Sequence, residues 1–213
     1  MKQAAGNDIE LLHRYTSLSS LFDILNKKRL TLLNYDNWDD KNDAFYMEKY
    51  KERKKLKTVL ALCFSEANET YHHWKIYTPQ SDGVRITFHR ERLLKIVCHV
   101  KNVRAERIVY KRIDEINKLK PVVNRLPFMK RLPYKDEKEF RIVYVNDAEN
   151  LEMKELPIKL GCIAKVTLNP WLPNPLVDAV KATIHSIPDC AGITVGRTGL
   201  LENERWKSAA MGR

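Results

Sequence analysis

The segment YKDEKEFRIVY, residues 134–144, constrains the fold most strongly, because it places two acidic residues one position apart at the start of an apolar pattern. Apolar side chains recur there at every second position from Phe140 to Tyr144. This period is that of a β-strand, and it directs Glu137 and Glu139 to the same face, about 6–7 Å apart. Two interpretations are open. The two acids form either the solvated start of a strand, where the surrounding basic residues neutralise them, or a buried pair that takes part in the chemistry of the protein.

Short strand and helix patterns fill the rest of the chain, without repeats or an interdomain linker. The run from Val59 to Phe64 is continuously apolar, which is typical of a central strand covered on both faces. A lysine-rich helical linker separates residue 110 from the strand of the two acids. We therefore expect one domain, residues 1–213, with mixed helices and strands. The other predicted strands lie at 11–16, 30–34, 84–88, 103–110, 161–168 and 191–195, and the predicted helices at 18–25, 41–57, 69–77 and 174–187.

Composition narrows the class of protein. With 213 residues, 44% of them hydrophobic, the chain can build one core of ordinary size. No apolar run approaches the eighteen or so residues of a membrane span, and the N-terminus lacks the apolar centre of a signal peptide, so we expect a cytoplasmic protein without membrane partners. Four widely spaced cysteines without a CxxC pair predict reduced core thiols: Cys63, Cys98, Cys162 and Cys190.

Positive charge is the second strong signal. The formal net charge is +11, and the excess gathers in residues 49–57 and 111–131. Such clusters attract polyanions, and interleaved rings could stack on bases. Solubility and counterion binding are the alternative explanation. The interleaved rings are Tyr46, Tyr50, Tyr110 and Phe128.

Several common sites are absent from the sequence. Neither GxGxxG nor GxxxxGK[ST] occurs, which argues against Rossmann and P-loop nucleotide sites. His72 and His73 are adjacent, so a helix would separate them by about 100° and they cannot form the paired ligands of a zinc helix. The acidic residues of the 36–43 stretch lack the glycine and distal glutamate of a calcium loop. We therefore expect no metal site.

The order of several short segments resembles a prokaryotic domain-of-unknown-function family that is placed in the ADP-ribosyltransferase superfamily. The resemblance covers residues 10–207. It implies an α+β fold of two packed, mainly antiparallel sheets with flanking helices around a cleft for NAD, which such enzymes use as a substrate without a metal. The segments that carry it are LHRYTSLSSLFDIL, ALCFSEANETYHHWKIY, DGVRITF, IVYKRI, PFMKRLPYKDEKEFRIVY and LLENERWK.

The resemblance also assigns residues to NAD. A basic residue on the first core strand contacts ribose or phosphate in such folds, and Arg14 is the matching position, with His13 as the fallback because only one of two neighbours on a strand can face the cleft. Ser65 matches a residue that braces NAD or the catalytic acid. The remaining NAD-binding assignments are Tyr15, Thr16, Trp74 and Tyr77, of which the last two either form a wall for nicotinamide or pack in the core.

Glu139 matches the catalytic glutamate, and Glu137 matches an additional acid that orients or deprotonates the acceptor. Release of nicotinamide produces an oxocarbenium-like ribose, which a fixed carboxylate stabilises. The sequence departs from the broader family at Trp38–Asp43, where an Asn-Asp-Pro type signature is common, so the contribution of this loop is open.

The resemblance and the basic clusters together imply an NAD-dependent ADP-ribosyltransferase that modifies nucleic acid, with RNA expected before DNA. A toxin or anti-phage effector is the implied biological role, and an antitoxin protein a candidate partner. Two alternatives remain: modification of a protein side chain, which two acids at this spacing permit, and a non-catalytic nucleic-acid-binding module on the same fold.

Overall fold

The computed structural model describes residues 10–211. Strand β3 (Thr58–Ser65) lies at the centre of its sheet, as its apolar run predicts. It pairs with β8 (Glu139–Asn146) over eight residue pairs, but it meets β1 (Leu11–Ser17) at the single pair His13–Ser65. The nine-stranded sheet therefore divides next to β3.

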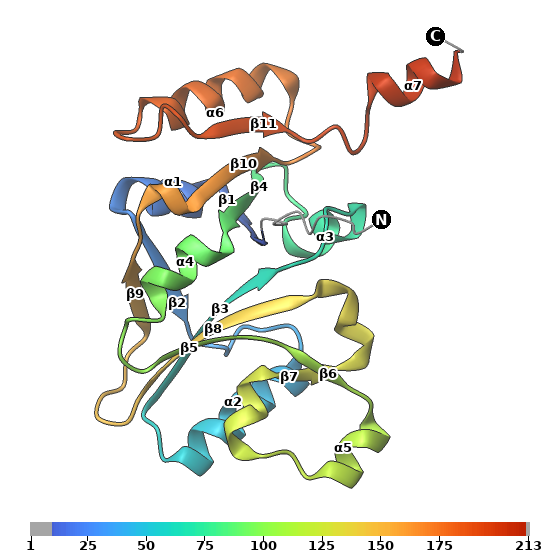
Figure 1. Ribbon diagram of the computed structural model, residues 1–213. Helices are drawn as coiled ribbons and strands as arrows, with labels where there is room; N and C mark the ends of the chain where they lie inside the picture. The colour runs from blue at the N-terminus through green and yellow to red at the C-terminus, as the bar shows by residue number, and fades with distance from the viewer. Residues whose placement is uncertain (1–9, 212–213) are drawn as a thin grey trace, which may run out of the picture.

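One part of the sheet runs in the order β11-β10-β4-β1, and the other in the order β3-β8-β5. Figure 1 shows the first part above the second. The pairs are antiparallel except β10 with β11, so the expected α+β class with a mainly antiparallel sheet is confirmed. The other strands of this sheet are β2 (Arg29–Leu33), β4 (Gly83–His89), β5 (Val103–Arg107), β9 (Met153–Pro157), β10 (Ile163–Leu168) and β11 (Thr194–Arg197).

Two short strands, β6 (Val109–Lys111) and β7 (Met129–Arg131), form a separate parallel ribbon. The single strand predicted at 103–110 is therefore wrong: β5 pairs with β8, and the chain then leaves that sheet for the ribbon. The helices are α1 (Leu18–Lys27), α2 (Lys41–Lys54), α3 (Tyr71–Tyr77), α4 (Arg90–Val97), α5 (Ile113–Leu119), α6 (Asn174–Ser186) and α7 (Glu204–Ala210), with 3-10 turns η1 (Val123–Phe128), η2 (Leu132–Glu137) and η3 (Leu160–Cys162).

Two hydrophobic cores cover the two faces of the β3–β8 pair. The larger core joins the two parts of the sheet, and in it the rings of Phe64 and Phe88 meet edge to face at 5.6 Å. The smaller core packs the opposite face of β8 against α2 and η1, around Met47 and Phe128. Strand β8 is therefore covered on both sides, which explains its continuous apolar run from Ile142 to Val145.

Polar side chains cap the N-termini of α1 and α2. Ser17 ends β1 and caps α1 by accepting a hydrogen bond from the Ser20 amide at 3.2 Å. Asp40 caps α2 in the same way, through the amides of Asn42 and Asp43. The four cysteines are free, but Cys98 is exposed, which contradicts the prediction that all four lie in the core. No helix among residues 10–211 is both long and apolar enough to cross a membrane.

Candidate active site

A cavity of about 430 Å³ opens where β1 and β3 diverge. Its walls come from these two strands, from α3, from the loop before α2, and from the ribbon, η2 and the start of β8. Glu137 and Glu139 both line it, together with Lys130 and Arg141. The other lining residues are His13, Arg14, Tyr15, Asn37, Trp38, Asp39, Asp40, Asp43, Cys63, Phe64, Ser65, Ile76, Tyr77 and Tyr134.

Arg141 is the buried centre of this site, with 0% of its surface exposed. Its guanidinium donates to both oxygens of Asp43, at 2.9 and 2.6 Å, and to Oε1 of Glu139 at 2.8 Å. It also donates to the Pro127 carbonyl at 2.9 Å and lies 4.6 Å from the ring of Trp38. Because a buried charge needs both a partner and hydrogen bonds, this network fixes Glu139 to the first turn of α2.

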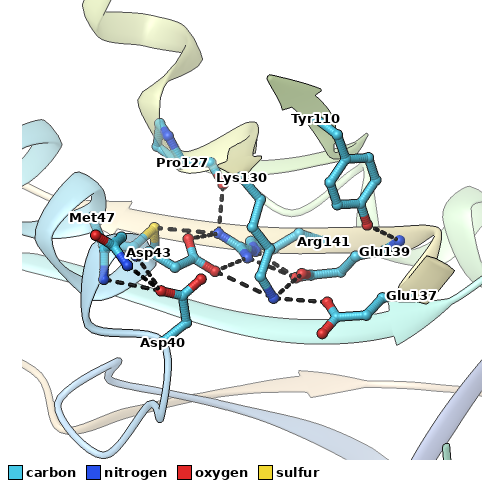
Figure 2. Close-up of polar contacts among 10 residues, drawn as sticks. Asp40, Asp43, Met47, Tyr110, Pro127, Lys130, Glu137, Glu139 and Arg141 are labelled. Atoms are coloured by element: carbon cyan, nitrogen blue, oxygen red, sulfur yellow. Dashed lines mark hydrogen bonds and ion pairs between the residues drawn. The ribbon is translucent and has the colours of Figure 1, made fainter. Parts of the chain in front are cut away.

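Lys130 of β7 contacts the same carboxylates from the other side, as Figure 2 shows. Its Nζ lies 2.7 Å from Oε2 of Glu137, 3.3 Å from Oε2 of Glu139 and 3.8 Å from Asp43. In Glu139, Oε1 is therefore held closely by Arg141, whereas Oε2 has a longer contact with Lys130.

The two acids come together in a way that strand alternation does not predict. Strand β8 begins at Glu139, and Glu137 ends η2. Lys138 between them is left-handed, with φ 42° and ψ 52°. The prediction of two acids on one strand face is therefore wrong, and their proximity arises because both approach Lys130. Glu139 is also only 6% exposed, which excludes the solvated alternative for this residue.

Two hydroxyl groups hold the backbone next to the acids. Ser65 donates to the carbonyl oxygen of Glu137 at 2.6 Å, so it positions one of the acids. Tyr110 accepts a hydrogen bond from the amide of Glu139 at 2.7 Å. The start of β8 is thus fixed from β3 on one side and from the ribbon on the other.

The environment shifts the pKa values of the two acids in opposite directions. Burial alone would raise the pKa of Glu139, but the charges of Arg141 and Lys130 outweigh burial and hold the pKa below its ordinary value. Burial raises the pKa of Glu137. The negative charge of Glu139 also raises it, and the two effects together outweigh the lowering by Lys130. Two carboxyl groups with separated pKa values can take different roles, one as a permanent anion and one as a group that exchanges a proton.

The residues assigned to NAD are only partly brought together. Arg14, Tyr15, Ser65 and Tyr77 line the cavity, whereas Thr16 and Trp74 do not. Trp74 is fully buried, donates from its indole to Glu69 at 2.7 Å and meets Tyr15 edge to face at 5.2 Å. The structure thus gives Trp74 a place in the packing, the alternative considered from the sequence.

Arg14 and His13 both contribute to the cavity wall, which strand alternation does not predict. Arg14 donates to the Cys63 carbonyl at 3.1 Å and is half-buried. His13 contacts Thr87 at 3.1 Å, and burial, with the nearby charge of Arg85, lowers its pKa to about 4. His13 is therefore neutral at neutral pH, and Arg14 is the cation of this wall.

Arg14 also lines a second cavity, of about 340 Å³, between α1 and β2. Ser19, Ser20 and Thr31 supply hydroxyl groups to its lining, and Asp23 supplies a carboxylate. The two cavities therefore have one cationic side chain in common.

Lys130, Tyr110 and the pairing of Asp43 with Arg141 are features of the candidate site that the sequence does not reveal. The sequence does give an indication for Arg141. A charged residue within a strand that is buried on both faces requires a buried counter-charge. The loop Trp38–Asp43 provides that partner together with an aromatic ring, so it contributes directly to the site. Among residues 10–211, no group of three or more His, Cys, Asp or Glu side chains is placed to hold a metal ion.

No protein-family model matches the chain, and no curated protein matches it. The chain is similar to solved structures of DarT from Thermus sp. 2.9. The complex with carba-NAD+ has 12% identity, covers 91% of this chain and 97% of that chain, and has a TM-score of 0.47. The complex with NAD+ has 12% identity, coverages of 90% and 96%, and a TM-score of 0.48. The complex with ADP-ribosylated single-stranded DNA has 11% identity, coverages of 93% and 98%, and a TM-score of 0.48. These scores describe a partial likeness of the chain path.

Proposed function

We propose that this protein is an NAD-dependent ADP-ribosyltransferase with a nucleic-acid acceptor. The observation that supports this best is the state of Glu139: an ionised carboxylate in a cavity wall, fixed through Oε1 by Arg141, with Oε2 in a looser contact. A fixed anion of this kind stabilises positive charge that develops on a bound substrate.

The two cavities that meet at Arg14 suit a dinucleotide. The larger cavity holds the acids and the ring of Tyr77, and we assign the nicotinamide riboside to it. The smaller cavity, with its hydroxyl groups, would take the adenosine end. Arg14 between them is a planar donor suited to the diphosphate that joins the two nucleosides.

The reaction breaks the bond between ribose C1′ and nicotinamide, and nicotinamide leaves with the bonding electron pair. Glu139 would accept a hydrogen bond from the ribose 2′-hydroxyl and stabilise the oxocarbenium-like cation. The acceptor then attacks C1′ and loses a proton. Glu137, whose pKa is raised, is the group that would take this proton.

Lys130 would have two effects in this scheme. Its contacts with both acids keep Glu137 next to Glu139, and its charge helps to keep Glu139 ionised. Ser65 supports Glu137 by donating to its carbonyl oxygen, and a role of Ser65 in bracing NAD or the catalytic acid Glu139 stays a prediction.

The choice of nucleic acid as acceptor rests on the formal net charge of +11. RNA before DNA, and a role as a toxin or anti-phage effector with an antitoxin, are further predictions from the resemblance.

The test is incubation with labelled NAD and separate pools of RNA, single-stranded DNA, duplex DNA and protein. Glu139→Gln keeps the shape of the side chain and removes its charge, so transfer should fall by roughly 10²-fold or more. Glu152→Gln, at an exposed position, is the matched control and should behave like the wild type. Undiminished labelling by a folded Glu139→Gln protein would disprove the catalytic assignment. Label in protein alone would replace nucleic acid as the acceptor.

A further inference from the structure

A groove lined by four cationic side chains runs along the outer side of the segment that carries Glu137. The cavity there has a volume of about 420 Å³, and no acidic side chain belongs to its lining. Within the described part of the chain, none of these four side chains forms an ion pair. They differ in this from the nearby Lys130, which is paired with Glu137. We call this cavity the cationic groove, and its cations are Lys111, Arg112, Arg131 and Lys135.

The β6–β7 ribbon separates the cationic groove from the active-site cavity. Lys111 pairs with Arg131 in this ribbon, and Tyr110 pairs with Lys130. Because neighbouring residues of a strand point to opposite faces, Tyr110 and Lys130 turn to Glu139, and Lys111 and Arg131 turn to the groove.

The η2 turn is divided between the two cavities in the same way. Leu132, Pro133 and Lys135 line the cationic groove, and Tyr134 and Glu137 line the active-site cavity. A molecule in the groove would therefore lie on the other side of the short turn that ends at the proposed proton acceptor.

A smaller cavity of about 250 Å³ connects these two regions, and we call it the side cavity. It shares Ile113 and Arg131 with the cationic groove, and Asp40, Asp43 and Lys130 with the active-site cavity. The rest of its lining combines an aromatic ring, apolar side chains and amides: Tyr46, Ile116, Met129, Asn42 and Asn117. An aromatic ring and amide groups in the lining of one cavity are suited to an unpaired nucleobase, which stacks and forms hydrogen bonds at the same time.

The other rings singled out in the sequence do not compete for this role. Tyr50 and Phe128 are buried in the smaller core, and the Tyr110 hydroxyl is bonded to the Glu139 amide. Tyr46 is the one of the four that lines the side cavity.

We infer that a single-stranded nucleic acid binds across the outer face of the ribbon, with backbone phosphates in the cationic groove and one unpaired base in the side cavity. This strand path leads to Glu137, and its use as the acceptor path rests on the proposed function. Four cations without acidic partners match the repeated charge of a phosphodiester backbone. A duplex cannot present an unpaired base to the side cavity, so single strands should bind more tightly than duplexes.

Binding can be tested without NAD, in the Glu139→Gln protein, so that catalysis does not affect the result. Fluorescence anisotropy would use labelled single-stranded RNA and DNA of about 12 nucleotides, a length within the site sizes common for such binding. The groove variant is Lys111→Glu with Arg131→Glu. The matched control is Lys181→Glu with Arg205→Glu, which makes the same charge change at exposed positions of α6 and α7, outside both basic clusters.

The groove variant should lose at least about tenfold in affinity. The slope of its log affinity against log salt concentration should be shallower by about two, the loss expected for about two phosphate contacts. The control variant should keep the wild-type affinity. Tyr46→Ala, with a melting curve to verify folding, should lose roughly tenfold, as expected for one stacked base. Equal losses in groove and control variants, or equal binding of duplex and single strands, would overturn the inference.

The two proposals can fail independently. If the groove variant binds oligonucleotides like the wild type while NAD still labels a protein, the strand path is wrong and ADP-ribosyl transfer stands. If the oligonucleotides bind as described but the wild type transfers no label from NAD to any pool, the enzyme assignment is wrong and the strand path stands.

Discussion

Replacement of Arg141 by methionine should destabilise the protein severely. The variant removes a guanidinium that is 0% exposed and leaves two carboxylates, Asp43 at 4% and Glu139 at 6% exposure, without their main counter-charge. Removing one partner of a buried ion pair typically costs about 3–5 kcal/mol, because the remaining charge stays desolvated. Since a domain of this kind is stabilised by roughly 5–15 kcal/mol in total, the loss should be obvious in urea unfolding followed by circular dichroism.

A second substitution separates lost charge pairing from lost packing. Asp43→Asn in the Arg141→Met background removes one of the stranded charges at nearly constant shape. The double variant should therefore be more stable than Arg141→Met alone, with a coupling free energy within the roughly 0.5–3 kcal/mol seen for residues of one network. Additive effects of the two substitutions, or a loss below about 1 kcal/mol for Arg141→Met, would refute the assignment of a buried charge network.

The destabilisation should also depend on pH in a defined direction. In the variant, the buried carboxyl groups have raised pKa values, so protonation as the pH falls removes the penalty. In the wild type, the pKa of Glu139 lies below its ordinary value of 4.5, so its contribution is present above pH 4.5 and is lost as the pH falls through the lower folded pKa. The difference in unfolding free energy between the two proteins should therefore shrink from pH 7 towards pH 4.5.

Three further predictions concern the cavities. Glu137→Gln should impair transfer to the acceptor more than NAD hydrolysis, and equal losses in both assays would contradict a role at the acceptor. Because the pKa of Glu137 is raised, the wild-type transfer rate should fall on the acidic side at a pH above 4.5, the ordinary pKa of glutamate, and the variant should lack this fall. Arg14→Ala should weaken NAD binding measured by calorimetry, and Arg14→Lys should restore it only partly, whereas a larger effect of His13→Ala would show that the wrong cation has been chosen. Trp74→Ala should lower the free energy of unfolding by about 3–5 kcal/mol, and a ligand-binding defect at unchanged stability would show instead that Trp74 contacts NAD.

Local patterns predict the elements that have a continuous local signal. The run Val59–Phe64 identifies the central strand, and the pattern of residues 18–25 identifies α1. The split of the sheet has no local signal, since it depends on β1 and β3 meeting at the pair His13–Ser65 and then diverging. The cavity that results is a property of tertiary structure.

The candidate site shows the same limit. Glu139 stands out in the sequence because a carboxylate at the start of an apolar strand needs an explanation. Lys130 does not stand out, because it is one of many lysines in a lysine-rich linker. Only the tertiary structure distinguishes it, since the ribbon pairs it with Tyr110 and directs it to the acids. The helical spacing of Trp74 does not distinguish its two possible roles, because an aromatic residue buried in the core and one that binds a ligand can have the same spacing.

The left-handed backbone of Lys138 determines which residues can occupy that position. Glycine or asparagine adopts this conformation readily, whereas a β-branched residue such as valine would favour extended backbone there. Extended backbone would lengthen β8 to include Glu137 and displace its carbonyl oxygen from the hydrogen bond that Ser65 donates. Proteins that share this pair of acids and their bridging lysine should therefore accept Lys, Asn or Gly between the acids and avoid Val and Ile, a substitution pattern that can be sought in sequences before any further structure is determined.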